Sequence, residues 1–377
     1  MKKLTLTIAL ASAFASMSAF AADVSIVKGD DEGTYKLQGG NTSVGLYGFV
    51  HLDVIKNFQQ DGGWAYDSGA VGGRKGVMQM TAESSRFGFK SVTKADIGTV
   101  RTKVEGDFAA NGQFRLRHAY GEIKSGSNTY LAGKTWDLFA DLDAAPETLD
   151  FGGPAGIALN RPEQLRFTTE TGAGTLAAAL QMPANTLSDA GQAPITKYPA
   201  LTGAWSKAGK TTYVALHGLI NPVTNEAVAG SDETKFGYGL NLAGTIKLGA
   251  SDTLLGNVTY GKGISQYLGG AYYNYETVDA SGEVVLNKVV AATLGLAHVW
   301  NGKVRSNVSY SYVKLGDEFS AAATANDKVS NAYINTIWTV ASNTELGLEY
   351  MYGNRKLNDG TTGGIASRIQ GSFHYNF

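Results

Sequence analysis

Long segments of this chain alternate apolar and polar residues with a period of two. Between Lys235 and Lys247 the even positions, Phe236 to Ile246, are mostly apolar, whereas the odd positions are polar or small. The alternation lasts about a dozen residues, longer than the roughly 5–6 residues of a strand in a globular sheet. It matches the ~9–11 tilted residues with which a strand crosses a bilayer. The pattern predicts strands that contact lipid on one face and water on the other.

The C-terminal segment follows the same rule. Ile369, Phe373 and Phe377 share one face, and Arg368 and Gln370 lie on the other. A soluble β-sandwich also alternates, but its strands are shorter and lack aromatic residues concentrated at their ends. Mean hydropathy is slightly negative, and no apolar run beyond the N-terminal region is long enough for a membrane helix. The period-two alternation therefore indicates the fold class, whereas mean hydropathy does not distinguish a membrane barrel from a soluble protein.

Sixteen such segments can be counted along the chain. We expect an all-β fold, a transmembrane antiparallel β-barrel of sixteen strands. The expected strands span residues 43–57, 76–91, 97–109, 113–124, 128–136, 162–171, 174–183, 197–207, 210–220, 235–248, 253–263, 287–300, 303–315, 328–341, 343–355 and 363–377.

The connections alternate between short and long. Tight turns are expected at 93–96, 125–127, 172–173, 208–209, 249–252, 301–302 and 341–342. Longer polar links are expected at 59–75, 135–161, 184–196, 221–234, 264–286 and 316–327, with two shorter ones at 109–112 and 356–362. Short periplasmic turns and longer external loops give this order, and an even strand number places both termini in the periplasm. Closure of the barrel also leaves no strand edge exposed to lipid.

The first 21 residues have the organisation of a secretory signal peptide. Lys2 and Lys3 precede an apolar run from Leu4 to Phe20, and Ala19-Phe20-Ala21 is a small-residue cleavage signal. A retained membrane anchor is the alternative, but the run is short and Asp23 follows it. We expect a signal peptide at 1–21, a short periplasmic N-terminal segment at 22–42 and the barrel at 43–377.

Composition and motifs argue against several other functions. Beyond the expected leader 30 basic and 33 acidic residues remain, a balance that does not suit a nucleic-acid partner. The chain has no cysteine, so disulfides supply no rigidity. No nucleophile-elbow motif occurs, and the histidines are too scattered for a zinc site. They are His51, His118, His217, His298 and His374. We expect no catalytic residues, no metal and no cofactor.

Arginines concentrate on the polar faces of the early strands. Arg86 lies opposite Phe87, and Arg166 lies opposite Leu165 and Phe167. An Arg or Lys on the lipid face would cost ~2–4 kcal/mol at the membrane midplane, so the arginines are expected to face the lumen. In 113–124 we expect Arg115 and Arg117 to face away from Leu116, His118 and Tyr120. The candidate basic pore residues are Arg86, Arg101, Arg115, Arg117, Arg161 and Arg166.

The link at 135–161 supplies the opposite charge. It follows the fifth strand and would be the third external loop, folded into the pore. Its candidate acidic pore residues are Asp141, Asp143, Glu147 and Asp150, which would face the arginines across a wet gap. Opposed charges across such a gap produce a transverse field, and rings of Arg or Lys favour anions. Ordinary lining of a polar lumen is the alternative for any single charge.

Several motifs carry a family resemblance. They are Ser85-Arg86-Phe87-Gly88-Phe89-Lys90, Lys103-Val104-Glu105-Gly106-Asp107-Phe108, Phe114-Arg115-Leu116-Arg117-His118-Ala119-Tyr120-Gly121-Glu122, Leu131-Ala132-Gly133-Lys134-Thr135-Trp136, Ala145-Pro146-Glu147-Thr148-Leu149-Asp150-Phe151-Gly152-Gly153-Pro154 and Gln164-Leu165-Arg166-Phe167. Together they resemble the DcaP-like porins of Gram-negative bacteria, most specifically over about 80–170. The resemblance implies a homotrimer of sixteen-stranded barrels, a third loop that narrows each pore, basic pore residues and uptake of small anions such as dicarboxylates. Some members carry a coiled coil before the barrel, whereas 22–42 shows no heptads.

The expected function is an outer-membrane porin that forms a water-filled diffusion channel for small hydrophilic, preferentially anionic solutes. A non-selective general diffusion porin is the first alternative. A barrel hydrolase or a structural barrel is the second, although sixteen strands leave an aqueous lumen. The expected partners are membrane lipid, lipopolysaccharide, small anionic solutes and, from the resemblance, two further copies of the chain.

Overall fold

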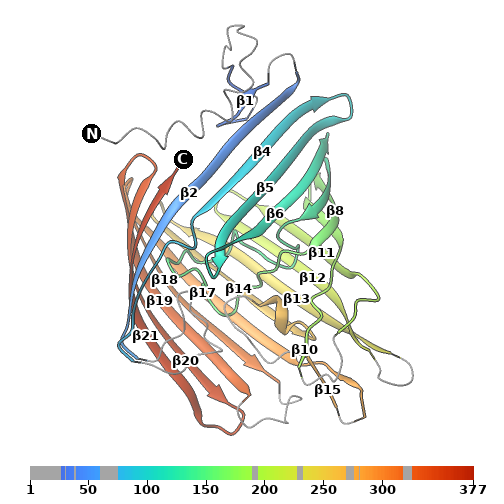
Figure 1. Cartoon of the computed structure of the whole chain (residues 1–377), viewed down its shortest axis with the longest axis vertical. Helices are drawn as coiled ribbons and strands as arrows, with labels where there is room; N and C mark the ends of the chain where they lie inside the picture. Colours follow the sequence, from blue (N-terminus) through green and yellow to red (C-terminus); the bar gives the residue numbers. More distant parts are fainter. Residues whose placement is uncertain are drawn as a thin grey trace.

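Strands of one large sheet wind around a closed barrel in the computed structural model (Figure 1). The structure describes residues 27–29, 31–37, 40–59, 75–188, 194–226, 232–268, 276–279, 281–316 and 325–377. The expected signal peptide at 1–21 lies outside these ranges. Among the described residues, no helix is long and apolar enough to span a membrane.

Sixteen long strands form the wall, as the alternation predicted. They are β2 (Thr42–Asn57), β4 (Arg86–Ala95), β5 (Gly98–Ala110), β6 (Gln113–Ser125), β7 (Asn128–Lys134), β8 (Glu163–Thr171), β9 (Gly174–Gln181), β11 (Ala200–Ala208), β12 (Thr212–Asn225), β13 (Glu233–Leu248), β14 (Asp252–Lys262), β17 (Lys288–Asn301), β18 (Val304–Leu315), β19 (Asn326–Ala341), β20 (Thr344–Leu357) and β21 (Thr362–Asn376). Each pairs antiparallel with the next, and β2 pairs with both β4 and β21.

The seam between the first and last long strands closes the barrel. Phe49 of β2 pairs with Asn376 of β21, and the pairing continues to Asn57 opposite Arg368. On its other side β2 pairs with β4, from Thr42 opposite Thr93 onwards. Because β2 has partners on both sides, the first strand leaves no free edge in the membrane.

The second expected strand, 76–91, proves to be two strands. β3 (Met78–Thr81) pairs with the later part of β2, and β4 pairs with its earlier part. Residues 82–85 between them leave the ladder, and Ser85 Oγ accepts a hydrogen bond of 3.0 Å from the backbone N–H of His51. The prediction of one continuous strand was wrong because alternation does not reveal a local interruption of pairing.

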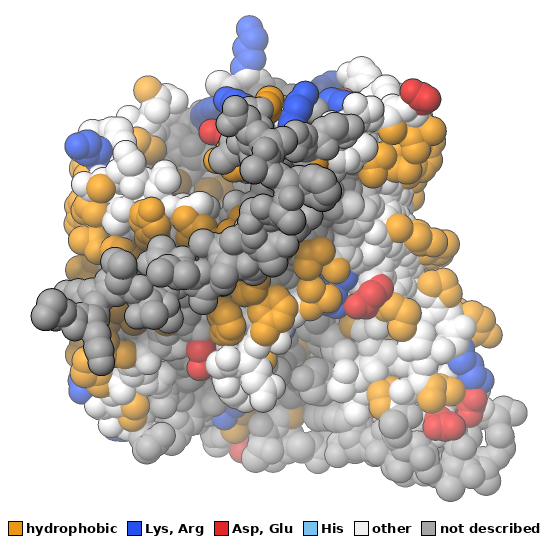
Figure 2. Space-filling model, turned by 45° about the horizontal axis from the view of Figure 1, so that its top comes forward, with side chains coloured by type: hydrophobic (Ala, Val, Ile, Leu, Met, Phe, Trp, Pro, Cys, Tyr) orange, Lys and Arg blue, Asp and Glu red, His pale blue; other side chains and the backbone are white. Residues whose placement is uncertain are grey.

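The two faces of the wall differ as expected for a barrel in lipid. Large apolar side chains lie exposed outside, among them Leu165, Leu294 and Leu240. Polar side chains such as Asn241 and Glu349 are buried on the inward face. Figure 2 shows hydrophobic side chains spread over the outer wall.

The two ends of the barrel are also different. The C-terminus and β1 (Tyr35–Lys36) lie at one end, with the tight turns of the wall (Figure 1). At the other end β10 (Leu187–Ser188), β15 (Glu276–Val278) and β16 (Val284–Val285) form a small sheet, with a 3-10 helix, η1 (Ser265–Tyr267), nearby. These elements lie within two of the expected polar links, 184–196 and 264–286, and sequence patterning did not predict them.

Candidate functional site

Basic side chains of β4, β5 and β6 gather around two buried carboxylates on the inward face. Asp107 accepts hydrogen bonds from Arg115 Nη2 at 2.8 Å and from Arg117 Nη1 at 2.6 Å. Glu105 lies 3.3 Å from Arg86 Nη1 and 3.1 Å from Lys103 Nζ. The carboxylates hold the guanidinium groups in fixed positions, because charge-assisted hydrogen bonds are short and directional.

A β-bulge gives this group its shape. Glu105 of β5 pairs with His118, but the next residue, Gly106, pairs with Leu116, so Arg117 is the extra residue of β6. His118 therefore shares the inward face with Arg117 and lies 3.8 Å from Glu105. The expectation that His118 and Tyr120 share the face of Leu116 was wrong, because one inserted residue reverses the alternation that follows it.

The other three candidate arginines lie in different surroundings. Arg101 contacts Asp31, at 3.2 Å, and Glu122, at 4.0 Å, near β1. Arg166 donates to Gln164 Oε1 at 2.9 Å and to the carbonyl of Trp136. Arg161 lies 4.4 Å from the centre of the Trp136 ring, and Arg117 lies 6.0 Å from the same ring. Arg161 thus belongs with the group on β4–β6, whereas Arg101 belongs to the end of the barrel that carries the C-terminus.

The segment between β7 and β8, residues 135–162, makes hydrogen bonds to inward-facing side chains of later strands. The side chains that bind the segment belong to strands from β12 to β21. They are His217 to Leu138 O (2.6 Å), Asn241 to Phe139 O (3.0 Å), Asn257 to Gly156 O (3.1 Å), Ser311 to Gly156 N (2.6 Å), Asn335 to Glu147 O (2.9 Å), Glu349 to Leu149 N (2.8 Å) and Gln370 to Leu149 O (3.0 Å). These hydrogen bonds fix the part of the segment between Leu138 and Gly156 to strands β12–β21.

Apolar packing supports these hydrogen bonds. The fully buried Phe139 lies against Gly239 of β13, where a Cβ atom would come within 2.8 Å of the ring. Leu149 lies equally close to Gly347 of β20, where a Cβ would be 2.6 Å from it. Glycine at these two positions lets the segment approach the wall, and larger residues there would displace it.

The acidic candidates of this segment bind the far wall more than they face the arginines. Asp141 accepts hydrogen bonds from Tyr213 at 2.8 Å and contacts His217 at 3.0 Å. Asp150 forms a buried ion pair with Arg368 at 2.5 Å. The expectation that the four acids face the arginines across a gap stays a prediction, and tertiary contacts engage the carboxylates of Asp141 and Asp150.

The other two acids remain accessible. Glu147 contacts Arg305 at 2.8 Å, and Asp143 is exposed. Arg305 also binds Glu345 of β20, which makes a three-member ion network. Two of the four acidic candidates, Glu147 and Asp150, line the same cavity as the arginines, and the carboxylate of Asp150 is buried.

A cavity of ≈ 510 Å³ lies between the arginines of β4 and β6 and the 135–162 segment, which contributes Arg161 to its lining. Its basic lining is Arg86, Arg115, Arg117 and Arg161. Aromatic rings complete the wall: Phe151 lies 5.6 Å from the guanidinium of Arg115, and Phe49 lies 5.0 Å from that of Arg86. A small anion in this space would meet fixed positive charge on one side and a firmly held chain segment on the other.

The residues that hold the segment were not predicted from the sequence. Three of them are the inward-facing amides Asn241, Asn257 and Asn335. Any polar residue can line a water-filled lumen, so the alternation alone does not distinguish these three. Their amide side chains could have indicated this role. An amide both donates and accepts hydrogen bonds, so it can bind the N–H and C=O groups of a buried backbone segment. Trp136 was also missed, although it lies two residues after the end of β7 and contacts Arg117, Arg161 and Arg166.

The fold and the interior together define the class of protein. A closed antiparallel barrel of sixteen strands, apolar outside and polar inside, is the architecture of outer-membrane porins. Within that class, the chain belongs to the DcaP outer membrane protein family, whose model matches residues 35–377.

Solved structures agree with this assignment. The outer membrane channel DcaP of Acinetobacter baumannii has a TM-score of 0.82 and 26% identity, covering 91% of this chain and 99% of that one. An anion-selective porin from Comamonas acidovorans shares the fold at TM-score 0.61 and 13% identity, with coverage of 89% and 100%. OmpF of Salmonella typhi does so at 0.60 and 13%, with coverage of 89% and 98%. Among curated proteins, nothing matches the sequence.

Replacing Asp150 with Ala should lower the free energy of unfolding by about 3–5 kcal/mol, because Arg368 would lose its buried counter-charge. Urea unfolding in lipid vesicles measures the loss. Asp143→Ala, at an exposed acid of the same segment, is the control and should change it by less than about 0.5 kcal/mol. Equal losses in the two variants would show that the ion pair does not fix the segment.

Asp137 should make stability depend on pH. Burial raises its pKa to about 7, and the Ala140 N–H and Arg166 offset this only in part. An unfolded Asp has a pKa of about 3.9, so between pH 4 and pH 7 the folded chain retains a proton that the unfolded chain releases. The unfolding free energy should therefore fall as pH rises through this window, and less steeply in Asp137→Asn. Parallel curves for wild type and variant would contradict this, and Asp143→Asn is the matched control.

Proposed function

We propose that this protein is a diffusion channel of the outer membrane that admits small hydrophilic solutes and prefers anions. The observation that carries the proposal is the cavity lined by Arg86, Arg115, Arg117 and Arg161. Dicarboxylates are the solutes that the family resemblance suggests. The names of two similar structures, a channel and an anion-selective porin, support the same function.

The charge around the cavity supports the anion preference. Four arginines and Lys103 face two carboxylates, Glu105 and Asp107, which leaves an excess of three positive charges on this side. The carboxylates reduce the positive potential but also fix the guanidinium groups. In a confined space bounded by protein, such an excess raises the local concentration of anions.

We propose further that the 135–162 segment narrows the channel. Its hydrogen bonds to β12–β21 support this proposal, as does Phe151, which lies within 6 Å of the guanidinium groups of both Arg115 and Arg117. In this proposal, Glu147 and the aromatic rings set the width, and the arginines set the sign of the selectivity. A channel without charge preference is the alternative, favoured by the ion pairs that bind most of the arginines.

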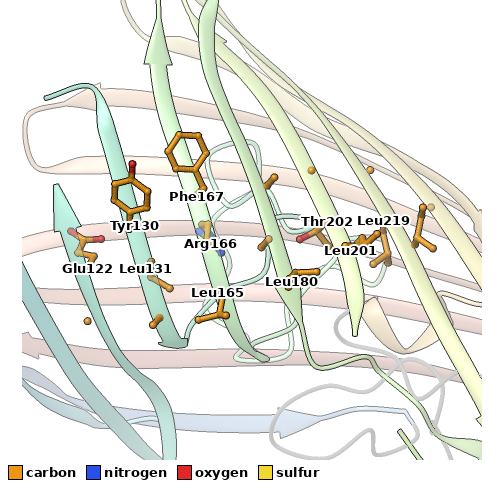
Figure 3. Close-up of a pocket in the computed structure, with 18 of the residues that line it drawn as sticks. Glu122, Tyr130, Leu131, Leu165, Arg166, Phe167, Leu180, Leu201, Thr202 and Leu219 are labelled. Atoms are coloured by element: carbon orange, nitrogen blue, oxygen red, sulfur yellow. The ribbon is translucent and has the colours of Figure 1, made fainter. Parts of the chain in front are cut away.

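The outer wall supports assembly into a homotrimer. A groove of ≈ 1200 Å³ runs over β5–β13, and small residues such as Gly121, Ala178 and Gly218 form its floor. Leu165, Phe167 and other large apolar side chains border it, as Figure 3 shows. A concave apolar surface of this kind suits the barrel wall of a second copy. A trimeric form of a similar barrel, OmpT of Vibrio cholerae, has been solved.

Arg161→Gln should shift the reversal potential of single channels towards cations. Arg161 stacks on Trp136, and among the described residues no carboxylate oxygen lies within 4 Å of its guanidinium. Its charge is therefore less neutralised than that of Arg117, and its removal should have the larger effect. Planar bilayers under a tenfold salt gradient measure the shift.

Arg101→Gln is the control, because Arg101 is paired with Asp31 and Glu122 away from the cavity. Its reversal potential should remain close to that of the wild type. An unchanged potential in Arg161→Gln would show that Arg161 lies off the conduction path. Cation preference in the wild type would refute the proposed anion preference.

A further inference from the structure

Barrel closure brings together two histidines that are far apart in the sequence. His51 of β2 and His374 of β21 are directly opposite each other at the seam, where the two strands lie side by side (Figure 1). The Nδ1 atoms of the two rings are 3.0 Å apart, and both residues line the ≈ 510 Å³ cavity that holds the arginines. A charge on this pair would therefore act on a solute in the cavity.

Each ring also has a partner at its other nitrogen. His51 Nε2 lies 2.9 Å from Oδ1 of Asp53, and His374 Nε2 lies 3.1 Å from Oδ1 of Asn376. Asp53 is buried and accepts a further hydrogen bond of 2.8 Å from Gln370. Asp53, His51, His374 and Asn376 thus form one chain of hydrogen bonds, which begins at a buried carboxylate and ends at an exposed amide.

This chain can be satisfied while both rings are neutral. A carboxylate only accepts hydrogen bonds, so His51 Nε2 carries a proton and His51 Nδ1 is an acceptor. His374 Nδ1 then donates to His51, which leaves His374 Nε2 as an acceptor. When the side-chain amide of Asn376 turns over, its NH₂ group donates to that nitrogen. In this state the two rings together carry no charge.

One additional proton can bind without a movement of either ring. It binds His374 Nε2, which then donates to Asn376 Oδ1, the amide orientation found in the structure. A hydrogen bond from a charged donor is stronger than one from a neutral donor, so this contact stabilises the added charge. Every ring nitrogen has a suitable partner in both states, and the two states differ by one positive charge.

Charged groups of both signs surround the pair. Asp53 on β2 and Glu345, which is directly opposite His374 on β20, favour the added proton. Arg86 of β4 opposes it from beyond the ring of Phe49, whose centre lies 4.5 Å from that of His374 and 5.0 Å from the guanidinium. The remaining charged groups nearby are Arg305, which binds Glu345, and the cavity residues Arg115, Arg117, Arg161, Glu147 and Asp150. Both charge states are therefore available to the pair, and histidine ordinarily changes its charge between pH 5 and pH 8.

We infer that His51 and His374 are selectivity-determining residues, and that the proton they bind together increases the anion preference of the channel as the pH falls. The inference rests on the proposed function, because it requires that solutes cross the cavity. The added charge lies in the same confined space as the arginines, so it raises the local concentration of anions. Anion preference is therefore higher at pH 5 than at pH 8.

Nitrogen NMR of histidine-labelled protein in detergent micelles follows the proton without any measurement of conductance. At pH 8, His51 should carry its proton on Nε2 and His374 on Nδ1, and at pH 5 both nitrogens of His374 should be protonated. The single variants His51→Gln and His374→Gln assign the signals. The opposite tautomers at pH 8, or no further protonation by pH 5, would contradict the hydrogen-bond chain whatever the selectivity of the channel.

Reversal potentials of single channels in planar bilayers, at pH 8 and pH 5 under the same salt gradient, test the effect on selectivity. The ratio of anion to cation permeability of the wild type should be roughly twofold higher at pH 5. The sign of the potential at pH 8 tests the proposed anion preference, whereas its change with pH tests the histidine pair. The two proposals can therefore fail separately.

Substitutions locate the proton. The double variant His51→Gln, His374→Gln should lose most of the rise while its conductance at pH 8 stays close to that of the wild type. His298→Gln is the matched control and should retain the rise, because His298 is paired with Asp252 and lies outside the cavity lining. Asp137 also changes its charge in this range, so Asp137→Asn is a second control that should retain most of the rise. An undiminished rise in the double variant, or its loss in His298→Gln, would refute the role of the pair.

Discussion

The need to satisfy every backbone N–H and C=O in a medium without water determines this structure. Hydrocarbon offers no hydrogen-bond partner, so the strands must close on themselves. The pairing of β2 with both β4 and β21 meets that requirement. The alternation of side chains then follows, because each strand separates lipid from the lumen. Closure also brings residues far apart in the chain, such as His51 and His374, into contact.

The interior is divided into two unlike halves. Strands β12–β21 carry amides and buried charges that bind the 135–162 segment, and Arg368 with Asp150 is the most buried of these contacts. Strands β4 and β6 carry arginines, which the segment contacts only through the rings of Phe151 and Trp136. The asymmetry arises because one link is long enough to lie along one wall while the opposite wall stays lined with charge. The proposed selectivity depends on that division.

Sequence patterning predicted the strands well and the site only in part. The strand expected at 235–248 is β13, and the turn at 301–302 is present, since both depend on local periodicity and turn chemistry. The inward position of His118 was not predictable, because the bulge beside Gly106 shifts the register by one residue. The partners of Asp141 and Asp150 depend on tertiary contacts that no local pattern records.

Five lysines at the loop ends of β14, β17, β18, β19 and β20 show the same limit. Lys262, Lys288 and Lys314 are 26 residues apart in sequence, and Lys328 and Lys356 follow at unequal spacings. Only the strand register brings all five to one level. A family resemblance adds the fold and a class of solute, but the arrangement of charges on a particular barrel has to be taken from its own pairing.

Thiol labelling along β5 tests the central claim directly, because the native chain has no cysteine. Four variants each replace one residue with cysteine, at Arg101, Thr102, Lys103 or Val104. Each variant is treated in proteoliposomes with a water-soluble, membrane-impermeant thiol reagent. Positions 101 and 103 should react and positions 102 and 104 should not, because the first pair faces water and the second faces lipid or a neighbouring barrel. Reaction at all four positions, or at none, would contradict a barrel with a lipid-facing exterior and a wet lumen.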